Sequence, residues 1–484
     1  MSLKAQAVSG AKWSGLSTGI VTALHFITLA LLARLLSPSD FGLMGMIMVV
    51  IGFARVFMDM GISNAIVYRQ NITKEELSSL YWLNILAGIT VFFIISASAP
   101  VIVSFYNEPQ LNDLVYLAAV IFLITPVGQQ FQILLQKELQ FKALAKIEII
   151  CSVTNSLTTI ILAINGFGVY SLVWGQLAGT SVRAVQLFYI GCKKWKPGWY
   201  FSWKGIKTYI SFGLYQMGEQ TINYFNTNLD YLLIGSFLGA KSLGYYTLAY
   251  NLIIRPASMI NPIITRVAFP VFSKVQNDLS KLKKGYLKVL ELLSLVNFPL
   301  MVGFAVVAPV AVPVIFGDQW FPSIILIQIL TIVGLLRSTG NPVGSLLLAR
   351  GRADLGFKWN LALMITQIPG LYIGAKFGGT VGVAIAFAIL MCIYSPFNYL
   401  ILIRKMVGPC LHDYFFSMWP SLWMSAVMGC MIIIIGLLFH SLSQLFLLII
   451  LVTSGMIIFC FLLVYMNNNL FSEIKQMVQI PNVD

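Results

Sequence analysis

Charged side chains are scarce in this chain. Only 10% of its 484 residues are Asp, Glu, Lys or Arg, whereas soluble globular proteins carry about 25%. Hydrophobic residues make up 58%. This balance excludes a soluble enzyme. Because one bilayer crossing takes roughly 20 apolar residues, a chain of this length holds about a dozen crossings and little else.

Acidic residues are scarcer than basic ones. The chain has 17 Asp and Glu against 31 Lys and Arg, which gives a formal net charge of +14. In a soluble protein such a charge would suggest nucleic acid as a partner. Here the basic residues lie in short segments between apolar runs, a pattern that sets the orientation of membrane helices. The charge therefore predicts topology, and we expect no nucleic-acid partner.

Closely spaced cysteines are also absent. The six cysteines lie far apart, in or beside apolar segments, and no histidine cluster is near them: Cys151, Cys192, Cys392, Cys410, Cys430 and Cys460. This spacing indicates neither a disulfide framework nor a metal site, so we expect no metal and no cofactor. The first apolar run, 13–36, is longer than a signal-peptide core and lacks a small-residue cleavage site after it. We expect it to remain as the first helix.

Apolar runs recur along the whole chain. They predict an all-α, polytopic membrane protein with about 14 transmembrane helices. The runs cover 13–36, 41–66, 78–105, 113–135, 147–165, 168–191, 207–237, 242–270, 285–316, 323–349, 356–376, 379–404, 416–439 and 442–466.

The positions of Lys and Arg support this number of helices. With the N terminus inside, most basic residues fall in segments that face the cytoplasm, and the outside turns hold only Arg34, Lys241 and Lys376. A missed helix would invert this alternation. We therefore predict a multi-pass membrane protein with both termini in the cytoplasm. The outside turns are too short to build the external site of a membrane glycosyltransferase, polymerase or ligase, so we do not expect an enzyme.

The two halves of the sequence resemble each other in a constant order. The matching segments are 36–42 (LSPSDFG) with 238–244 (LGAKSLG), Phe141-Lys142 with Phe357-Lys358, and Gly168 with Gly379. Six helices separate each pair, so the repeat is parallel. This predicts a six-helix lobe at 1–204, a second at 205–404, an extra helix pair at 405–466 and a cytoplasmic tail at 467–484.

Three arginines interrupt runs that are predicted to span the bilayer: Arg55, Arg255 and Arg337. Each lies roughly 20 Å along a helix that enters from outside, so we expect one basic belt near the midplane. Arginine binds phosphate bidentately and stays charged, which points to a substrate with phosphates. For Arg55, structural pairing with Asp59 one turn on is an equal alternative. Arg183 lies near a basic loop and can reach the membrane surface, so we exclude it.

The predicted helix 207–237 is the most polar of the spans, and its polar residues include Gln216 and Asp230. Glu219, Asn223 and Asn226 lie at i, i+4 and i+7, which places them on one face. A helix that faced lipid could not carry these residues. We expect the helix to line a central cleft together with the first helix.

Short segments from the third to the tenth predicted helix resemble a known family. They are 81–84 (YWLN), 128–131 (GQQF) with 136–139 (QKEL), 226–229 (NTNL), 248–251 (LAYN), 261–266 (NPIITR), and 333–342 (VGLLRSTGNP) followed by 344–347 (GSLL). The family is the polysaccharide transporter branch, or Wzx-type flippases, of the multidrug/oligosaccharidyl-lipid/polysaccharide exporter superfamily. The resemblance is closest to the colanic acid and teichuronic acid exporters.

The resemblance implies a transporter of the bacterial cytoplasmic (inner) membrane that moves an undecaprenyl-pyrophosphate-linked oligosaccharide repeat unit to the external leaflet by alternating access. The product would serve exopolysaccharide, capsule, O-antigen or lipopolysaccharide assembly. The resemblance also implies two six-helix lobes around a cationic cavity, in which the three arginines hold the pyrophosphate. The cavity would be lined by Asn223, Asn226, Asn341 and Gln216. Membrane lipid is an expected partner, and polymerase and chain-length proteins are candidate partners.

Three residues are candidates for coupling transport to an ion gradient: Glu219, Asp59 and His25. Burial shifts a carboxylate toward its protonated form, and histidine titrates near neutrality. For His25 an interhelical hydrogen bond is the alternative role, and for Glu219 a counter-charge to the arginines.

Two other exporters of the same superfamily stay open as alternatives. A multidrug exporter typically handles organic cations, which three central arginines would repel. A peptidoglycan-precursor exporter carries another pyrophosphate-linked lipid, and charge alone does not exclude it.

Overall fold

The computed structural model describes residues 3–60, 62–63, 66, 72–340 and 342–466. These residues form helices, with no strand among them. The chain divides into two compact units. The first comprises Met1–Thr247 with Phe357–Val383, and the second comprises Leu248–Gly356 with Ala384–Asp484.

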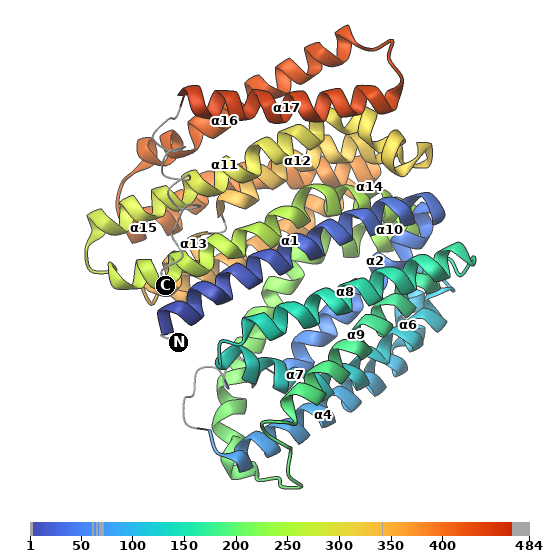
Figure 1. Ribbon diagram of the computed structural model, residues 1–484, viewed down its shortest axis with the longest axis vertical. Helices are drawn as coiled ribbons and strands as arrows, with labels where there is room; N and C mark the ends of the chain where they lie inside the picture. The colour runs from blue at the N-terminus through green and yellow to red at the C-terminus, as the bar shows by residue number, and fades with distance from the viewer. Residues whose placement is uncertain (1–2, 61, 64–65, 67–71, 341, 467–484) are drawn as a thin grey trace. The chain divides into compact units, whose positions relative to one another are not determined.

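The first unit is a helical bundle (Figure 1). Its helices are α1 (Leu3–Leu35), α2 (Pro38–Asp59), α4 (Lys74–Ala97), α5 (Ala99–Tyr106), α6 (Leu111–Ala119), α7 (Ile121–Lys137), α8 (Phe141–Ile164) and α9 (Val169–Gly191). Helix α8 packs against α1 and α9, and α7 packs against α4 and α9.

Local sequence explains where α2 begins. The Ser37 hydroxyl accepts a hydrogen bond from the Asp40 backbone N–H, and the Asp40 carboxylate accepts one from the Ser37 backbone N–H, which is a capping box. Asp40 also accepts a hydrogen bond of 3.1 Å from the backbone of Val169, the first residue of α9. One carboxylate therefore fixes the starts of two helices. Helix α2 ends at Asp59, since Met60 adopts a left-handed conformation (φ 43°) and interrupts the predicted run 41–66.

Two glycines turn long helical segments back on themselves. Helix α10 (Trp203–Lys274) turns at Gly239, and α14 (Ala353–Asn398) turns at Gly379. Gly379 (φ 57°, ψ −143°) nearly repeats the backbone conformation of Gly168 (φ 53°, ψ −136°) at the start of α9. Residues with a side chain rarely adopt this conformation, so the pairing of these glycines in the predicted repeat has a structural counterpart.

The two turns that the sequence repeat pairs, 36–42 and 238–244, pack against each other within the first unit. A Cβ atom on Gly42 would overlap the backbone carbonyl of Ala240, and one on Gly244 would overlap the backbone carbonyl of Pro38. The contact is reciprocal, because each turn supplies one glycine and one backbone carbonyl. Glycine is required at both positions for the backbones to approach this closely.

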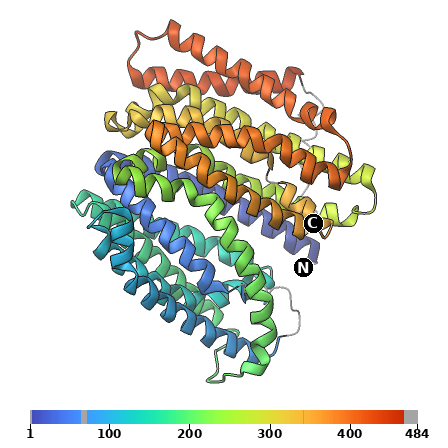
Figure 2. The ribbon, with the colours of Figure 1, turned by 180° about the vertical axis from the view of Figure 1, so that it is seen from behind.

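The second unit holds α10 from Leu248 onward and most of the later helices. These are α11 (Leu279–Ala311), η1 (Val312–Phe316), η2 (Asp318–Trp320), α12 (Pro322–Gly340), α13 (Pro342–Ala349), η3 (Tyr399–Ile403), α15 (Arg404–Val407), α16 (Leu411–Leu438) and α17 (Gln444–Met466). Helix α11 packs against α12, α16 and α17 (Figure 2). Its Val307 joins Met428, Ile432 and Leu451 in a buried apolar cluster.

The helices have the length and composition of membrane spans. Ten helical stretches among the described residues are long and apolar enough to cross a membrane, and one of them, 354–407, turns at Gly379. Helix α9 and the two halves of α10 add further long helices. The fold is therefore all-α and polytopic with about 14 helical segments, as the sequence predicts. The predicted run 78–105 divides into α4 and α5 at Ser98.

Candidate functional site

Arg255 and Arg337 lie in the second unit and are held by consecutive residues of α10. Arg337 Nη1 donates a hydrogen bond of 3.1 Å to the Tyr250 hydroxyl. Arg255 Nη1 donates one of 3.0 Å to Oδ1 of Asn251, which is 8% exposed. The two guanidinium groups are thus tied to the same turn of α10. Among the described residues this is the one hydrogen bond of the exposed Arg255 side chain, which has further N–H donors.

Arg55 lies about one turn before the end of helix α2 at Asp59. The C-terminal end of a helix carries a negative partial charge, which stabilises a cation in the last turn. Arg55 is therefore favoured electrostatically where it lies.

The first unit also holds a pair of arginines. Arg55 of α2 lies close enough to Arg183 of α9 for the two charges to interact, and close to Tyr224 of α10. The sequence excluded Arg183 from the site because it can reach the membrane surface, and the structure places it within electrostatic range of Arg55. Two like charges held close together favour the binding of an anion between them.

Asp59, the predicted partner of Arg55, is bound by two other side chains. Its Oδ1 accepts a hydrogen bond of 2.6 Å from Gln129 Nε2 of α7, and a second from the Ser63 hydroxyl. Gln129 lies in the segment 128–131 that carries part of the family resemblance. The next residue, Gln130, donates to the Leu77 carbonyl of α4 at 2.8 Å. This segment therefore joins α7 to two other parts of the first unit.

The polar residues of the first half of α10 fall into different surroundings. Asn226 Nδ2 donates a hydrogen bond of 2.7 Å to the Asn360 carbonyl of α14, and Asn226 Oδ1 is buried with no hydrogen-bond partner among the described residues. Glu219 and Asn223 are exposed. The side chain of Gln216 lies outside the described residues, as does Asn341.

His25 lies in α1 and is half-buried. Its ring meets the ring of the neighbouring Phe26 edge to face, with 6.4 Å between centroids. Two turns earlier on α1, the Ser17 hydroxyl donates to Glu148 of α8 at 2.8 Å. Polar side chains of α1 thus face α8 of the same unit.

Asp230 of α10 is buried, although the sequence assigned it no separate role. It is 2% exposed. The Tyr246 hydroxyl donates to its carboxylate at 2.6 Å, and the Tyr231 backbone N–H donates at 3.0 Å. Tyr246 lies beyond the turn at Gly239, so this bond joins the two halves of α10 near their turn.

Sequence reasoning also missed Tyr250 and Asn251, which hold the two arginines of the second unit. A signal for them was present, since both lie in the segment 248–251 that resembles the family. Asn251 lies four residues before Arg255 in α10, so helical spacing could have identified it. Tyr250 and Arg337 lie on different helices, and spacing identifies neighbours within one helix only.

Comparisons with known proteins decide the family. A family model described as a polysaccharide biosynthesis protein matches residues 31–325. The chain is 37% identical over 425 residues to the lipopolysaccharide biosynthesis protein WzxC of Escherichia coli (strain K12), covering 88% of this chain and 86% of that protein. The chain belongs to the polysaccharide biosynthesis protein family. The expected resemblance to Wzx-type exporters is confirmed.

A further relative supports this family, and a solved structure shares the fold. The chain is 37% identical over 434 residues to the teichuronic acid biosynthesis protein TuaB of Bacillus subtilis (strain 168), covering 88% of each protein. The lipid II flippase MurJ in its inward closed conformation matches with a TM-score of 0.76 and 16% identity, over 95% of this chain and 99% of that one. At this identity the match shows the fold alone, which is that of a multi-pass membrane protein.

Proposed function

We propose that this protein is a flippase for an undecaprenyl-pyrophosphate-linked oligosaccharide repeat unit. It moves this lipid across the bacterial cytoplasmic membrane by alternating access, for surface polysaccharide assembly. The observation that carries the proposal is the pair Arg255 and Arg337, held on one turn of α10 by Asn251 and Tyr250. A guanidinium in a membrane helix is costly unless it faces a protein or aqueous interior. Its planar fork of donors matches phosphate oxygens.

The pyrophosphate is assigned to Arg55, Arg255 and Arg337, and Arg183 joins Arg55 in the first unit. The sugars are assigned to Asn223, Asn226, Asn341 and Gln216, since side-chain amides both donate to and accept from hydroxyl groups.

Coupling to an ion gradient is assigned to Glu219, Asp59 and His25. Glu219 is the first residue to test, because its side chain is exposed. The carboxylate of Asp59 is engaged by Gln129 and Ser63, so a proton there would compete with existing hydrogen bonds.

The protein changes the position of its substrate rather than its covalent bonds, so we propose no enzymatic activity. Both termini lie in the cytoplasm in this proposal, and a polymerase or chain-length protein takes over the product. A multidrug exporter is disfavoured because paired arginines repel organic cations. A peptidoglycan-precursor exporter shares the pyrophosphate chemistry, but WzxC and TuaB are named for other polysaccharides.

Deletion of the gene in its host tests the proposal. Lipid-linked glycans are then extracted and analysed by mass spectrometry, alongside the surface polymer. We expect a complete, unpolymerised repeat unit to accumulate on undecaprenyl pyrophosphate while the surface polymer disappears. Unchanged lipid-linked glycans together with higher drug sensitivity would instead support the multidrug exporter. Accumulation of a peptidoglycan precursor would support the other alternative.

A further inference from the structure

The segment between α9 and α10, residues 192–203, carries an exposed set of aromatic and basic side chains. We call it the basic aromatic connector. Trp199 is 92% exposed, and three more of its aromatic residues are exposed: Tyr200, Phe201 and Trp203. Lys193, Lys194 and Lys196 are exposed as well. The segment contains no Asp or Glu.

The backbone of the connector is fixed to α4. The backbone N–H of Gly198 donates to the Ser78 hydroxyl, and that of Ser202 donates to the Ser79 hydroxyl, each at 3.0 Å. Trp82 Nε1 donates to the Gly198 carbonyl at 2.9 Å. These three bonds hold the connector across the first turns of α4, so its exposed aromatic residues form a defined surface.

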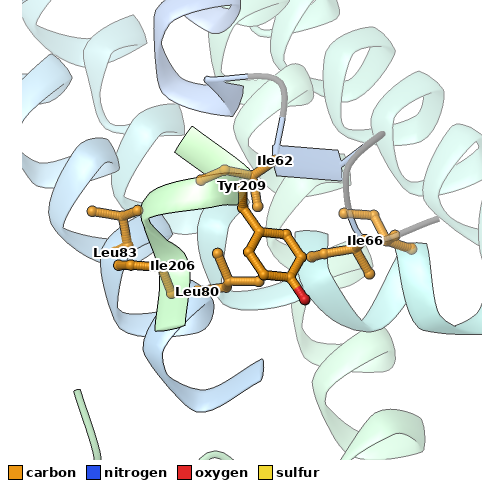
Figure 3. Packing of buried hydrophobic residues seen from close by; sticks show 7 residues of the cluster. Ile62, Ile66, Leu80, Leu83, Ile206 and Tyr209 are labelled. Atoms are coloured by element: carbon orange, nitrogen blue, oxygen red, sulfur yellow. The ribbon is translucent and has the colours of Figure 1, made fainter. Parts of the chain in front are cut away.

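Both flanks of this surface are packed. Trp195 contacts the buried cluster of Tyr81 and Phe131 on one side. On the other side, Tyr209 lies among Ile66 and Leu80 in the cluster that Figure 3 shows. The aromatic residues from Trp199 to Trp203 lie between these two packed regions and remain exposed.

The exposed surface keeps a net positive charge. Lys194 forms an ion pair with Glu138. The Lys193 ammonium lies 4.3 Å from the ring centroid of Tyr189 and has no ion-pair partner among the described residues. Lys196 also has no ion-pair partner in the described part of the chain. Two lysines therefore remain to attract an anion.

The connector lies where membrane-length helices end. It follows the last residue of α9, Gly191, and packs on the first turns of α4, which begins at Lys74. Helix ends of this kind lie at the level of lipid headgroups, where tryptophan and tyrosine are enriched. Basic residues at this level attract anionic lipids, at about five-fold enrichment per lysine.

We propose that the basic aromatic connector is a docking surface for anionic phospholipid headgroups of the leaflet that it faces. The aromatic rings insert at the boundary between headgroups and acyl chains, while Lys193 and Lys196 bind the phosphates. The connector also joins the two predicted repeats, so bound lipid fixes this junction to the membrane surface. This inference does not depend on which substrate is transported.

Fluorescence quenching of Trp199 tests the inference. The full-length protein is reconstituted into nanodiscs that contain phosphatidylglycerol or phosphatidylcholine brominated on the acyl chains, at equal mole fractions. Trp199 stacks on Trp82, with 4.6 Å between ring centroids, so both the wild type and Trp199→Phe carry Trp82→Phe, and the Trp199 signal is the difference between these two proteins. At low salt we expect the quenching by brominated phosphatidylglycerol to be at least about five times the quenching by brominated phosphatidylcholine. At high salt this preference should be lost.

Two charge variants control the test. Lys193→Gln with Lys196→Gln should bring the quenching ratio close to one. The matched pair Lys241→Gln with Lys376→Gln changes two exposed lysines elsewhere and should leave the ratio unchanged. Equal quenching by both lipids in the wild type would overturn the inference. So would a Trp199 signal that only aqueous acrylamide quenches, because the surface would then face water or a soluble partner.

Discussion

The Tyr250 hydroxyl accepts a hydrogen bond of 3.1 Å from Nη1 of Arg337, although 87 residues separate them. Tyr250 is also the neighbour of Asn251, which holds Arg255. One turn of α10 thus orients the two guanidinium groups that we assign to the pyrophosphate. Replacing Tyr250 or Asn251 therefore tests the proposed pyrophosphate site, as replacing the arginines does.

Replacing Tyr250 with Phe removes the acceptor and keeps the ring. Hydrogen bonds to charged groups contribute about 1.5–3 kcal/mol, so we expect transport to fall by roughly ten-fold or more. Transport is measured as the rate at which the lipid-linked glycan reaches the outer leaflet of proteoliposomes. Tyr372→Phe is the matched control, because the exposed Tyr372 meets Phe237 through its ring. Equal rates for wild type and Tyr250→Phe would show that this bond does not orient Arg337.

Replacing Arg255 or Arg337 with Ala should impair translocation without loss of protein from the membrane. Replacement with Lys should give an intermediate rate, because lysine keeps the charge but loses the planar fork of donors. Surface polysaccharide is measured in a deletion strain that expresses each variant, with protein amounts compared by immunoblot. Arg404→Ala is a control in the same unit, since Arg404 is exposed. Wild-type surface polysaccharide in both Ala variants would count against the proposed pyrophosphate site.

If Glu219 couples transport to a proton gradient, Glu219→Gln should abolish the dependence of transport on that gradient. The glutamine keeps the size of the side chain and removes its ability to bind and release a proton. The measurement compares proteoliposomes with and without an imposed pH difference. Glu75→Gln serves as a control at another exposed carboxylate. If transport by Glu219→Gln depends on the gradient as strongly as transport by the wild type, at normal expression, Glu219 is not the coupling residue.

Replacing Gly42 with Ala should destabilise the first unit. The added methyl group would overlap the Ala240 carbonyl, and overpacking of this kind costs about 1–3 kcal/mol. The helical Gly19 has open space around it, so Gly19→Ala should be neutral or slightly stabilising. Thermal unfolding of the detergent-purified variants checks both expectations. A melting temperature of Gly42→Ala equal to that of the wild type would mean that the two turns separate at little cost.

The sequence alone determined the membrane class, the number of helical segments and several of their ends. It could do so because a crossing requires a local run of apolar residues. The glycines at 168 and 379 were also paired correctly, since their unusual backbone conformation restricts the residue type. All of these features act over a few residues.

The tertiary structure decided which side chains meet. It placed Arg183 near Arg55, gave Asp59 the partner Gln129, and separated the packed Asn226 from the exposed Glu219. Helical periodicity assigns residues to a face of their own helix. Which helix that face meets depends on how whole helices pack, at angles and distances set by many side chains together. That physical difference is why the sequence identified the helices, whereas the structure identified the partners that hold their polar residues.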